Sequence, residues 1–484
     1  MVLNHALGYL TAAALQAAAA LGLVAALTRL LDDAQFGQYG LAAAALHLYQ
    51  SILFFWLRAS VSRFHSRAER ENQLAPFLAG IRRWFCVVAM AGLVVGAAAV
   101  LVAPASPGLH VTLWLTLLAG TAQSGFALVL ELHRARLKAW RFALFQCAQS
   151  VLSVVLSVAL VLAWGRMAGG AYGAALAMGG MALSFALAIA VDGAALRFWS
   201  GGGRSAPGSL TLILAYGLPM TAAMVLDAVV ITGDRFIIAH YLGEAGVAPY
   251  AAAQTLAQRS LTAICTVVGA AAAPLAFTAL ERHGSDEATK RLADAGELVF
   301  AVALPAAFGL AAVAGPLTDV MVGESLRAEA RMLLPWIAAG GLMQGLAVHY
   351  FQQAYLLARK PVALVLTLTP AMTVYFAGNF ALIPVYGALG AAMALVASQV
   401  VQLASVIAVG RRYFPMPLCA GTALKAALIS AVMLAALRIL PLPGGALGLV
   451  AQVALGVAIY ALGALVVDLA HSREHATRLL RRRA

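Results

Sequence analysis

The sequence predicts an all-α polytopic membrane protein with fourteen transmembrane helices, arranged as two six-helix lobes followed by two additional helices. Three observations lead to this fold class: the composition, a succession of apolar runs, and an alternation of basic residues. Of the 484 residues, 63% are hydrophobic and 11% are charged, whereas soluble domains are about 25% charged. Too few polar residues are present to cover a water-soluble globule. The composition excludes a cytosolic enzyme, a disordered regulator and a secreted disulfide scaffold.

Fourteen apolar runs are each long enough to cross a bilayer, which takes about 20 residues of helix. The loops between them are too short to fold as separate domains. The first run is expected to remain in the protein as a helix, because no positively charged segment precedes it as in a signal peptide. The runs centre on Ala17, Leu46, Leu93, Ala119, Val154, Gly180, Val225, Thr262, Leu304, Met343, Leu368, Val396, Ala431 and Val457.

Basic residues alternate from one loop to the next, and this alternation predicts which side of the membrane each loop faces. The loops after even-numbered runs, together with the C-terminal tail, carry 25 Lys and Arg residues, whereas the loops after odd-numbered runs carry six. Lys and Arg are retained on the cytoplasmic side of membrane proteins. We therefore expect a multi-pass protein of the bacterial inner membrane with both termini in the cytoplasm.

The net charge of +13 is thus interpreted as a topology signal. We expect the cytoplasmic basic residues to contact anionic membrane lipids, and we do not expect nucleic acid as a partner. The basic, amphipathic stretch 131–140 is expected to lie along the cytoplasmic membrane surface.

An internal repeat divides the chain. Residues 31–49 align without gaps with residues 242–260, an offset of 211 that places Tyr39 on Tyr250. Because each repeat has an even number of runs, the two halves should be related by a pseudo-two-fold axis along the membrane normal. The predicted domains are an N-lobe over 1–200, a C-lobe over 201–414, and two additional helices with a basic tail over 415–484. This architecture predicts a cavity between the lobes and alternating access by rocking.

The residues that usually carry metal or catalytic chemistry show no such pattern. The four cysteines lie far apart and none has a metal-ligand spacing, so we interpret them as packing residues. Paired carboxylates, a nucleophile–base set and a phosphate-binding glycine loop are all missing from the sequence. We therefore expect no metal, no bound cofactor and no catalysis.

Several short stretches resemble signatures of one transporter family. They are 30–40 in the first outer loop, 217–219 and 233–238 in the seventh run, 317–323 with 334–335, and 379–392 in a later helix–loop–helix. In this order they resemble the Wzx-type polysaccharide and O-antigen flippases of the multidrug/oligosaccharidyl-lipid/polysaccharide exporter superfamily. The resemblance covers nearly the whole chain.

The resemblance implies a function in exopolysaccharide or O-antigen synthesis. Such flippases move an undecaprenyl-diphosphate-linked oligosaccharide from the cytoplasmic to the periplasmic leaflet, and their first, second, seventh and eighth helices line a central cationic cavity. A polysaccharide polymerase or another assembly protein is an implied partner. Multidrug exporters of the superfamily usually have twelve helices, whereas lipid II flippases also have fourteen, so lipid II stays open as a substrate.

Ionisable side chains inside apolar runs are costly and usually face a cavity or a partner. Arg259 is the first candidate for binding a lipid diphosphate, because the arginine fork fits phosphate. Arg58 and Arg63 follow near the cytoplasmic mouth, although arginines there also snorkel toward the interface. The alternative for Arg259 is a structural pair with Asp227. The other cavity candidates are His47, Gln50, Gln254 and Gln258.

These other candidates form polar stripes in the second and eighth runs. His47, Gln50 and Arg58 lie at spacings of three and eight residues, which share one face of a continuous helix. Gln254 and Gln258 lie one turn apart, and the repeat aligns His47 with Gln258. We expect both stripes to line the cavity at matched depth.

Two carboxylates of the seventh run, Asp227 and Asp234, share a helical face. An intramembrane carboxylate can take up H⁺ or Na⁺ and couple an ion gradient to transport. Asp227, Asp234 and Arg235 are therefore the candidates for ion coupling or gating. The alternatives are a salt bridge from Asp227 to Arg259, and a structural cap by Asp234 and Arg235 at the outer end of the helix.

The tenth run contains a secondary polar stripe of Gln344, His349 and Gln352. Such residues can bind sugar hydroxyls or form hydrogen bonds between helices. We favour the second interpretation.

Two other functions compete with the flippase hypothesis. A multidrug or small-molecule exporter driven by Na⁺ or H⁺ would use the same architecture and would need Asp227. A membrane polysaccharide polymerase or ligase would carry a large outer loop with catalytic basic residues. The outer loops at 104–110 and 383–387 are short and contain no Lys, Arg, Asp or Glu, so we expect a transporter and not an enzyme.

Overall fold

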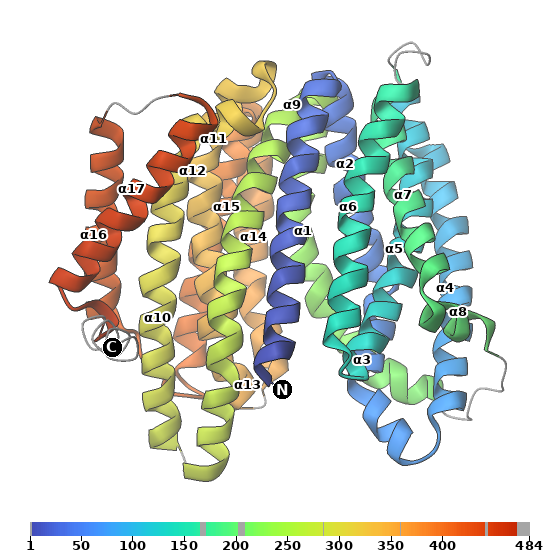
Figure 1. The fold of residues 1–484 in the computed structure, drawn as a ribbon, viewed down its shortest axis with the longest axis horizontal. Coiled ribbons are helices and arrows are strands. Elements are labelled where there is room, and N and C mark those ends of the chain that lie inside the picture. Colours follow the sequence, from blue (N-terminus) through green and yellow to red (C-terminus); the bar gives the residue numbers. More distant parts are fainter. Residues whose placement is uncertain are drawn as a thin grey trace. The chain divides into compact units, whose positions relative to one another are not determined.

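The computed structural model describes residues 2–164, 171–201, 209–283, 285–358, 360–440 and 444–471. The described residues form helices joined by short turns, without a strand, as the composition predicted (Figure 1). The chain divides into two compact units, unit 1 over Met1–Ala251 and unit 2 over Ala252–Ala484. This spatial division lies inside a helix, and the domain ranges derived from the repeat stay a prediction.

Unit 1 is a bundle of long apolar helices whose ends are set by capping residues. Asp32 accepts a hydrogen bond of 2.8 Å from the Gln35 backbone N–H, and Ser106 accepts one of 3.2 Å from Leu109; both satisfy donors at a helix start. The described elements are α1 (Val2–Leu30), α2 (Asp33–Leu53), α3 (Phe55–Arg70), α4 (Leu74–Val102), α5 (Pro107–Ala135), α6 (Ala139–Trp164), α7 (Gly173–Val191), α8 (Gly193–Ser200) and the start of α9 (Ser209–His283).

The helices α2 and α3 form a broken pair bent by 49°. Trp56 Nε1 donates a hydrogen bond of 2.7 Å to the Leu53 carbonyl, so an indole satisfies a backbone group at the break. Phe54 packs at the bend against Tyr49 and Phe85, with ring centroids 5.7 and 5.1 Å away. Bulky aromatic packing therefore fixes the bend in place.

An aromatic cluster also fixes the short helix α8. The ring of Trp199 lies 4.9 Å from Phe85 of α4 and 4.8 Å from Phe198, both edge-on. Residues of α3, α4, α5, α8 and the start of α9 share this apolar core. Burial of large aromatic side chains contributes strongly to stability, so α8 is a fixed part of unit 1.

The stretch 131–140 is a helix–turn–helix corner. α5 continues to Ala135 and α6 begins at Ala139. Glu131 is buried, and Leu137 adopts a left-handed backbone with φ of 54°, which reverses the chain within a few residues. The stretch is therefore a turn between two helices and not one continuous segment, and its place at the membrane surface stays a prediction.

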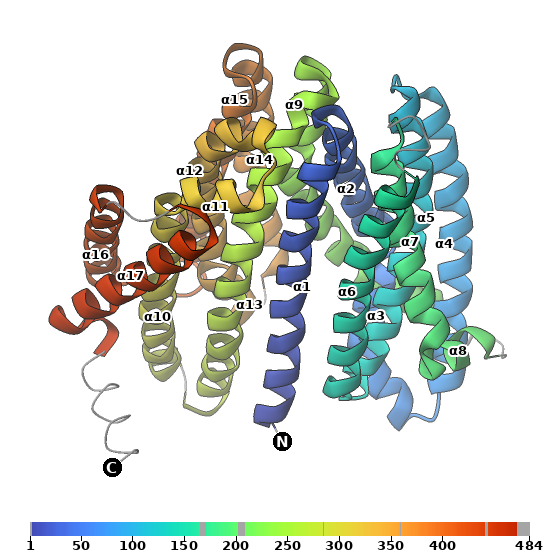
Figure 2. The same cartoon turned by 45° about the horizontal axis from the view of Figure 1, so that its top comes forward.

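Unit 2 contains the rest of α9 and eight further α-helices among its described residues. α16 and α17 lie beside α10 (Figure 2). The Tyr460 hydroxyl of α17 donates a hydrogen bond of 2.7 Å to the Ala301 carbonyl of α10. The elements are α10 (Ser285–Ala312), α11 (Ala314–Met321), α12 (Glu324–Leu346), a π-helical turn (Ala347–Phe351), α13 (Gln353–Leu357), α14 (Pro361–Tyr386), α15 (Ala388–Gly410), α16 (Ala420–Ile439), α17 (Gly445–Val466) and a 3-10 turn (Leu469–His471).

In the described part of the chain, twelve helices are long and apolar enough to cross a membrane, or thirteen if the bent pair α2–α3 is one span. The stretch Ile213–Leu261 counts as one of the twelve. However, α9 is non-helical at Gly243, and the predicted runs centred on Val225 and Thr262 fall on opposite sides of this break. A polytopic helical membrane fold is confirmed, and the count of fourteen stays a prediction.

The helix boundaries follow the repeat. α4 begins at Leu74 and α10 begins 211 residues later at Ser285, which is the offset found in the sequence. The turn at Asp32 before α2 corresponds in the same way to Gly243, where α9 breaks. The seventh and eighth predicted runs, which together form most of α9, thus correspond to α1 and α2.

Candidate functional site

The first part of α9 lies along α2 and α3 within unit 1. Near the start of α9, the Ser60 hydroxyl lies 3.4 Å from the Ile213 carbonyl oxygen, and the rings of Phe64 and Tyr216 are 5.6 Å apart. The far end of this segment is the break at Gly243. Because α9 begins the second repeat, the seam between α2–α3 and α9 joins the two repeats and is the candidate gate of a transport path.

A carboxylate closes this seam beside the break in α9. Glu244 Oε2 accepts a hydrogen bond of 2.7 Å from Gln38 Nε2, and Glu244 Oε1 accepts one of 2.7 Å from the Ser106 hydroxyl. The three side chains belong to α9, α2 and the N-cap of α5. One acid therefore ties three elements together. We call the region around this acid the Glu244 junction. It comprises Gln38, Ser106 and Glu244, together with Gly37, Gly40 and Arg235, whose contacts are described next.

Two glycines allow the backbones to approach closely at the junction. A Cβ on Gly37 would lie 1.7 Å from the Glu244 carbonyl oxygen, and a Cβ on Gly40 would lie 2.9 Å from the Ala251 Cβ. Only glycine permits such an approach. Gly40 and Ala251 differ by the repeat offset of 211, so two repeat-related positions face each other, as residues do on a two-fold axis.

The buried pair Asp234 and Arg235 supports the junction from within α9. The Asp234 side chain is 0% exposed and accepts hydrogen bonds from the Tyr250 hydroxyl and from the Arg235 backbone N–H. Arg235 Nη1 donates a hydrogen bond of 2.9 Å to the Gly40 carbonyl. These bonds connect Asp234 and Arg235 to other parts of unit 1, but both residues lie within α9 before the break at Gly243, and a role as a cap of the helix end stays a prediction. Asp227, two turns earlier, is half-buried, and a role of these residues in ion coupling stays a prediction.

The predicted polar residues of the second run lie on both sides of the α2–α3 bend. Arg58 is half-buried, its Nε has no hydrogen-bond partner among the described residues, and Glu131 acts on it electrostatically. Gln50 Nε2 is likewise buried and unpartnered in the described part of the chain. His47 is half-buried and Arg63 is exposed. The prediction that these residues share one face of a continuous helix is wrong, because a bend of 49° separates α2 from α3.

The predicted stripe of the eighth run lies at the start of unit 2. Gln254 is 0% exposed, Gln258 is half-buried, and Arg259 is exposed. The stripe therefore passes from an enclosed amide to an accessible guanidinium within two turns. The predicted pairing of Arg259 with Asp227 of unit 1 stays a prediction.

The secondary stripe lies where the helix after α12 becomes irregular. Gln344 is in the last turn of α12, His349 is in the π-helical turn Ala347–Phe351, and Gln352 caps that turn. All three side chains are half-buried. A π turn inserts an extra residue and is frequent at functional sites, so the regular spacing assumed for this stripe does not hold.

Two polar features of unit 1, one buried and one half-buried, were not predicted. His133 Nε2 and Asp192 Oδ2 are 2.7 Å apart and both side chains are buried, and the His133 ring stacks on Phe145. Glu244 is the second feature. The repeat aligns Glu244 with Asp33, so a carboxylate beside a turn recurs in both halves; for His133 and Asp192 the sequence gives no comparable signal.

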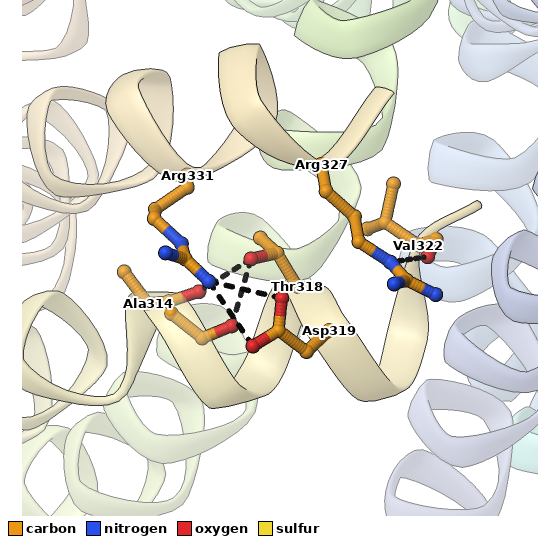
Figure 3. A network of polar contacts seen from close by, with 7 residues as sticks. Ala314, Thr318, Asp319, Val322, Arg327 and Arg331 are labelled. Carbon is orange, nitrogen blue, oxygen red and sulfur yellow. Dashed lines mark hydrogen bonds and ion pairs between the residues drawn. The ribbon is translucent and has the colours of Figure 1, made fainter. Parts of the chain in front are cut away.

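An exposed ion pair holds the corner between α11 and α12 in unit 2 (Figure 3). Arg331 Nη2 lies 2.9 and 3.0 Å from the two carboxylate oxygens of Asp319. Arg327 Nε donates a hydrogen bond of 3.0 Å to the Val322 carbonyl. Exposed pairs of this kind stabilise a fold weakly, so we interpret the corner as a structural brace.

Within the residues that the structure describes, no cluster of three or more His, Cys, Asp or Glu side chains could hold a metal ion. Several of the polar groups described above, such as Glu244, Arg235 and Asp234, connect segments of unit 1 by hydrogen bonds. Their chemistry is that of hydrogen bonding and charge recognition, which suits the binding and movement of a ligand.

Comparison with known proteins gives a family and a fold. A family described as polysaccharide biosynthesis protein matches residues 26–329, whereas no curated protein sequence matches the chain. The lipid II flippase MurJ in an inward closed conformation is similar in structure, with a TM-score of 0.75, 12% identity, and coverage of 94% of this chain and 97% of that chain.

Two transporters of the MOP superfamily are also similar. One is a multidrug resistance MATE family transporter in an inward-facing conformation, with a TM-score of 0.54, 14% identity, and coverage of 87% of this chain and 95% of that chain. The other is a transporter from Pyrococcus furiosus, with a TM-score of 0.54, 13% identity, and coverage of 91% and 96%. At these identities the likeness shows the fold, which is MurJ- and MATE-like.

Proposed function

This chain belongs to the family of polysaccharide biosynthesis proteins, and from this premise we propose that it flips an undecaprenyl-diphosphate-linked oligosaccharide across the membrane. The chain is a multi-pass membrane protein and a transporter of the flippase type. The proposed direction is from the cytoplasmic to the periplasmic leaflet of a bacterial inner membrane, with both termini in the cytoplasm. The proposed partners are the polymerase and other assembly proteins that use the translocated oligosaccharide.

The observation that carries the substrate proposal is the state of Arg58. A diphosphate that enters an apolar protein needs cationic donors to replace its water shell. Arg58 is half-buried at the bend between α2 and α3, and its Nε has no hydrogen-bond partner among the described residues. The planar guanidinium can bind two phosphate oxygens at once. Arg63, exposed one to two turns further along α3, supplies a second positive charge.

The seam of α2–α3 with α9 supplies the proposed gate. Movement of a polar head group along this path requires the Glu244 junction to separate, which breaks the bonds from Gln38 and Ser106 to Glu244. These bonds would re-form after release. Coupling to Na⁺ or H⁺ through Asp227 is part of the proposal, since its carboxylate is half-buried within α9.

The test is a flipping assay in proteoliposomes. Undecaprenyl diphosphate that carries a fluorescent oligosaccharide is placed in both leaflets, and a membrane-impermeant reagent quenches the label that reaches the outer leaflet. We expect Arg58→Ala to slow flipping about 10- to 100-fold, because a charge-assisted hydrogen bond contributes about 1.5–3 kcal/mol. Arg70→Ala, an exposed arginine at the end of the same helix, is the matched control. Equal flipping by both variants at equal protein amounts would contradict the role of Arg58.

The same assay separates the rival substrates. A lipid II flippase would move labelled lipid II in place of the oligosaccharide lipid, and a multidrug exporter would move neither. If the protein moves no oligosaccharide lipid from one leaflet to the other, with or without an ion gradient, this result would contradict the proposed function.

A further inference from the structure

Five cationic side chains converge on a pocket of about 430 Å³ at one end of unit 1. The pocket lies between α4, the α5–α6 turn, the start of α6, and α8. Arg82 Nη1 donates a hydrogen bond of 2.7 Å to the Phe198 carbonyl, which joins α4 to α8. The left-handed backbone at Leu137 brings both of its neighbours to the pocket. The five cations are Arg82, Arg136, Lys138, Arg141 and Arg197.

The cluster has no acidic partner in the described part of the chain. Arg67 pairs with Glu71 at 2.7 Å and Arg291 pairs with Glu287 at 3.2 Å, but none of the five pocket cations forms such an ion pair. Like charges that converge repel one another. A bound anion would relieve this repulsion, and the pocket volume lies in the range of about 300–1,000 Å³ usual for small-ligand sites.

The rim of the pocket has the character of a membrane boundary. The side chains of Leu137 and Trp140 are 70% and 74% exposed, although both are apolar. The helices α4 and α6 are candidate membrane spans, and the pocket lies at the start of each. Tryptophan is enriched at the level of lipid head groups, so the pocket faces the head groups of one leaflet.

We propose that this pocket binds the phosphate-bearing head group of a membrane lipid. Arginine forks take phosphate oxygens in pairs and lysine adds a point charge, while Ala75, Leu78 and Phe198 supply an apolar wall for the stem that carries the phosphate. An anionic phospholipid and a polyprenyl diphosphate share this chemistry. The polyprenyl source alone rests on the proposed function, because the substrate would then dock here before it enters the seam.

Native mass spectrometry of the full-length protein in detergent tests the pocket. The probes are phosphatidylglycerol and undecaprenyl diphosphate, with zwitterionic phosphatidylcholine as the reference lipid. The pocket variant is K138Q/R141Q and the matched control is R70Q/R83Q. All four side chains are exposed, and each variant loses two positive charges. We expect the pocket variant to bind at least one of the two anionic lipids about tenfold more weakly than the control does.

The outcomes separate the two sources of phosphate and the two proposals. Preferential binding of undecaprenyl diphosphate over phosphatidylglycerol supports a docking site for the substrate, and equal binding supports a site for bulk phospholipid. Equal affinities of the pocket variant and the control for both anionic lipids would overturn the pocket, and Arg136→Gln repeats the test at a third position. Because binding is measured without flipping, its failure is distinct from failure of the transport assay.

Discussion

The Glu244 junction and the five-cation pocket lie in the same unit and treat charge in opposite ways. In the junction, the single carboxylate of Glu244 accepts hydrogen bonds from Gln38 and Ser106, and two glycines bring the backbones together. In the pocket, five positive charges surround an open volume and have no acidic partner among the described residues. The Glu244 carboxylate finds its hydrogen-bond donors within the junction, although the buried Gln38 Oε1 has no partner among the described residues. The pocket, in contrast, needs a ligand to balance its charge.

This difference indicates that the junction stabilises one conformation and that the pocket recognises a ligand. A satisfied, closely packed contact costs free energy to open. It can therefore hold a transporter in one state until binding elsewhere offsets that cost. Binding of an anion to a cluster of like charges lowers the free energy, because it relieves their mutual repulsion. The comparison predicts that substitutions in the junction change the conformational equilibrium, and that substitutions in the pocket change binding.

The largest effect is expected from Gly37→Ala. The added methyl group would meet the Glu244 backbone carbonyl, and neither backbone can yield without separating α2 from α9. Overpacking typically costs about 1–3 kcal/mol. We expect a cysteine placed at the buried Val247 (V247C, in a cysteine-free background) to react with a maleimide at least tenfold faster when G37A is added.

Gly180→Ala is the control for this experiment. Its methyl group would meet the Ser157 backbone, where α6 packs on α7, so it is also destabilising but lies outside the junction. Slow labelling of V247C in G180A and fast labelling in G37A would confirm local opening. Equal labelling rates in the two variants would mean that Gly37 does not hold the junction closed.

A smaller effect is expected from Glu244→Ala, which removes the acceptor of two hydrogen bonds. Hydrogen bonds to a charged group contribute about 1.5–3 kcal/mol when buried, and the partial exposure of Glu244 lowers this value. We expect labelling of V247C to rise about three- to tenfold. Glu244→Gln keeps one acceptor oxygen and should give an intermediate rate. A rate for E244Q equal to that of E244A would show that charge, and not the remaining hydrogen bond, holds the junction.

Both regions show where sequence reasoning reaches its limit. The apolar runs predict the helices because the span of a bilayer fixes their length, and the repeat offset of 211 recurs in the helix starts of α4 and α10. The contact of Gly40 with Ala251 could not be predicted, since alignment of two positions in a repeat does not show that they touch. The wide spacing of the cysteines and the missing catalytic patterns in the sequence gave only expectations of absence.

The five-cation pocket could not be predicted from the sequence for a related reason. Arg82 and Arg197 are 115 positions apart, and on the basis of sequence both served only to orient the helices. Long apolar helices can pack in many rotations, so the sequence does not specify which basic residues converge. The bend after Leu53 and the turn at Leu137 depend on packing of aromatic side chains and on one left-handed residue, neither of which periodicity reveals.

The third prediction concerns Ala75→Glu, a substitution that places an acidic partner among the cations of the pocket. Ala75 lines the pocket and is the second residue of α4. A glutamate there would face the cations and would lie at a helix N-terminus, where an acid contributes about 0.3–1 kcal/mol. We expect Ala75→Glu to raise the melting temperature slightly in detergent and to weaken binding of phosphatidylglycerol. Ala75→Gln, similar in size but neutral, should do neither; a weakened affinity in A75Q would show that volume, and not charge, matters.

The smallest effect is expected from Arg331→Gln at the α11–α12 corner of unit 2. Arg331 pairs with Asp319 at 2.9 Å, but both side chains are about half exposed, so water screens the pair and its loss should cost about 0.2–1 kcal/mol. Thermal unfolding of R331Q and of D319N should show nearly equal, small shifts, with flipping and V247C labelling unchanged. Fast labelling of V247C in R331Q would instead mean that the corner controls the junction. Such a result would show that conformation is not controlled by the junction alone. An exposed ion pair in unit 2 would then also affect the opening of the junction in unit 1.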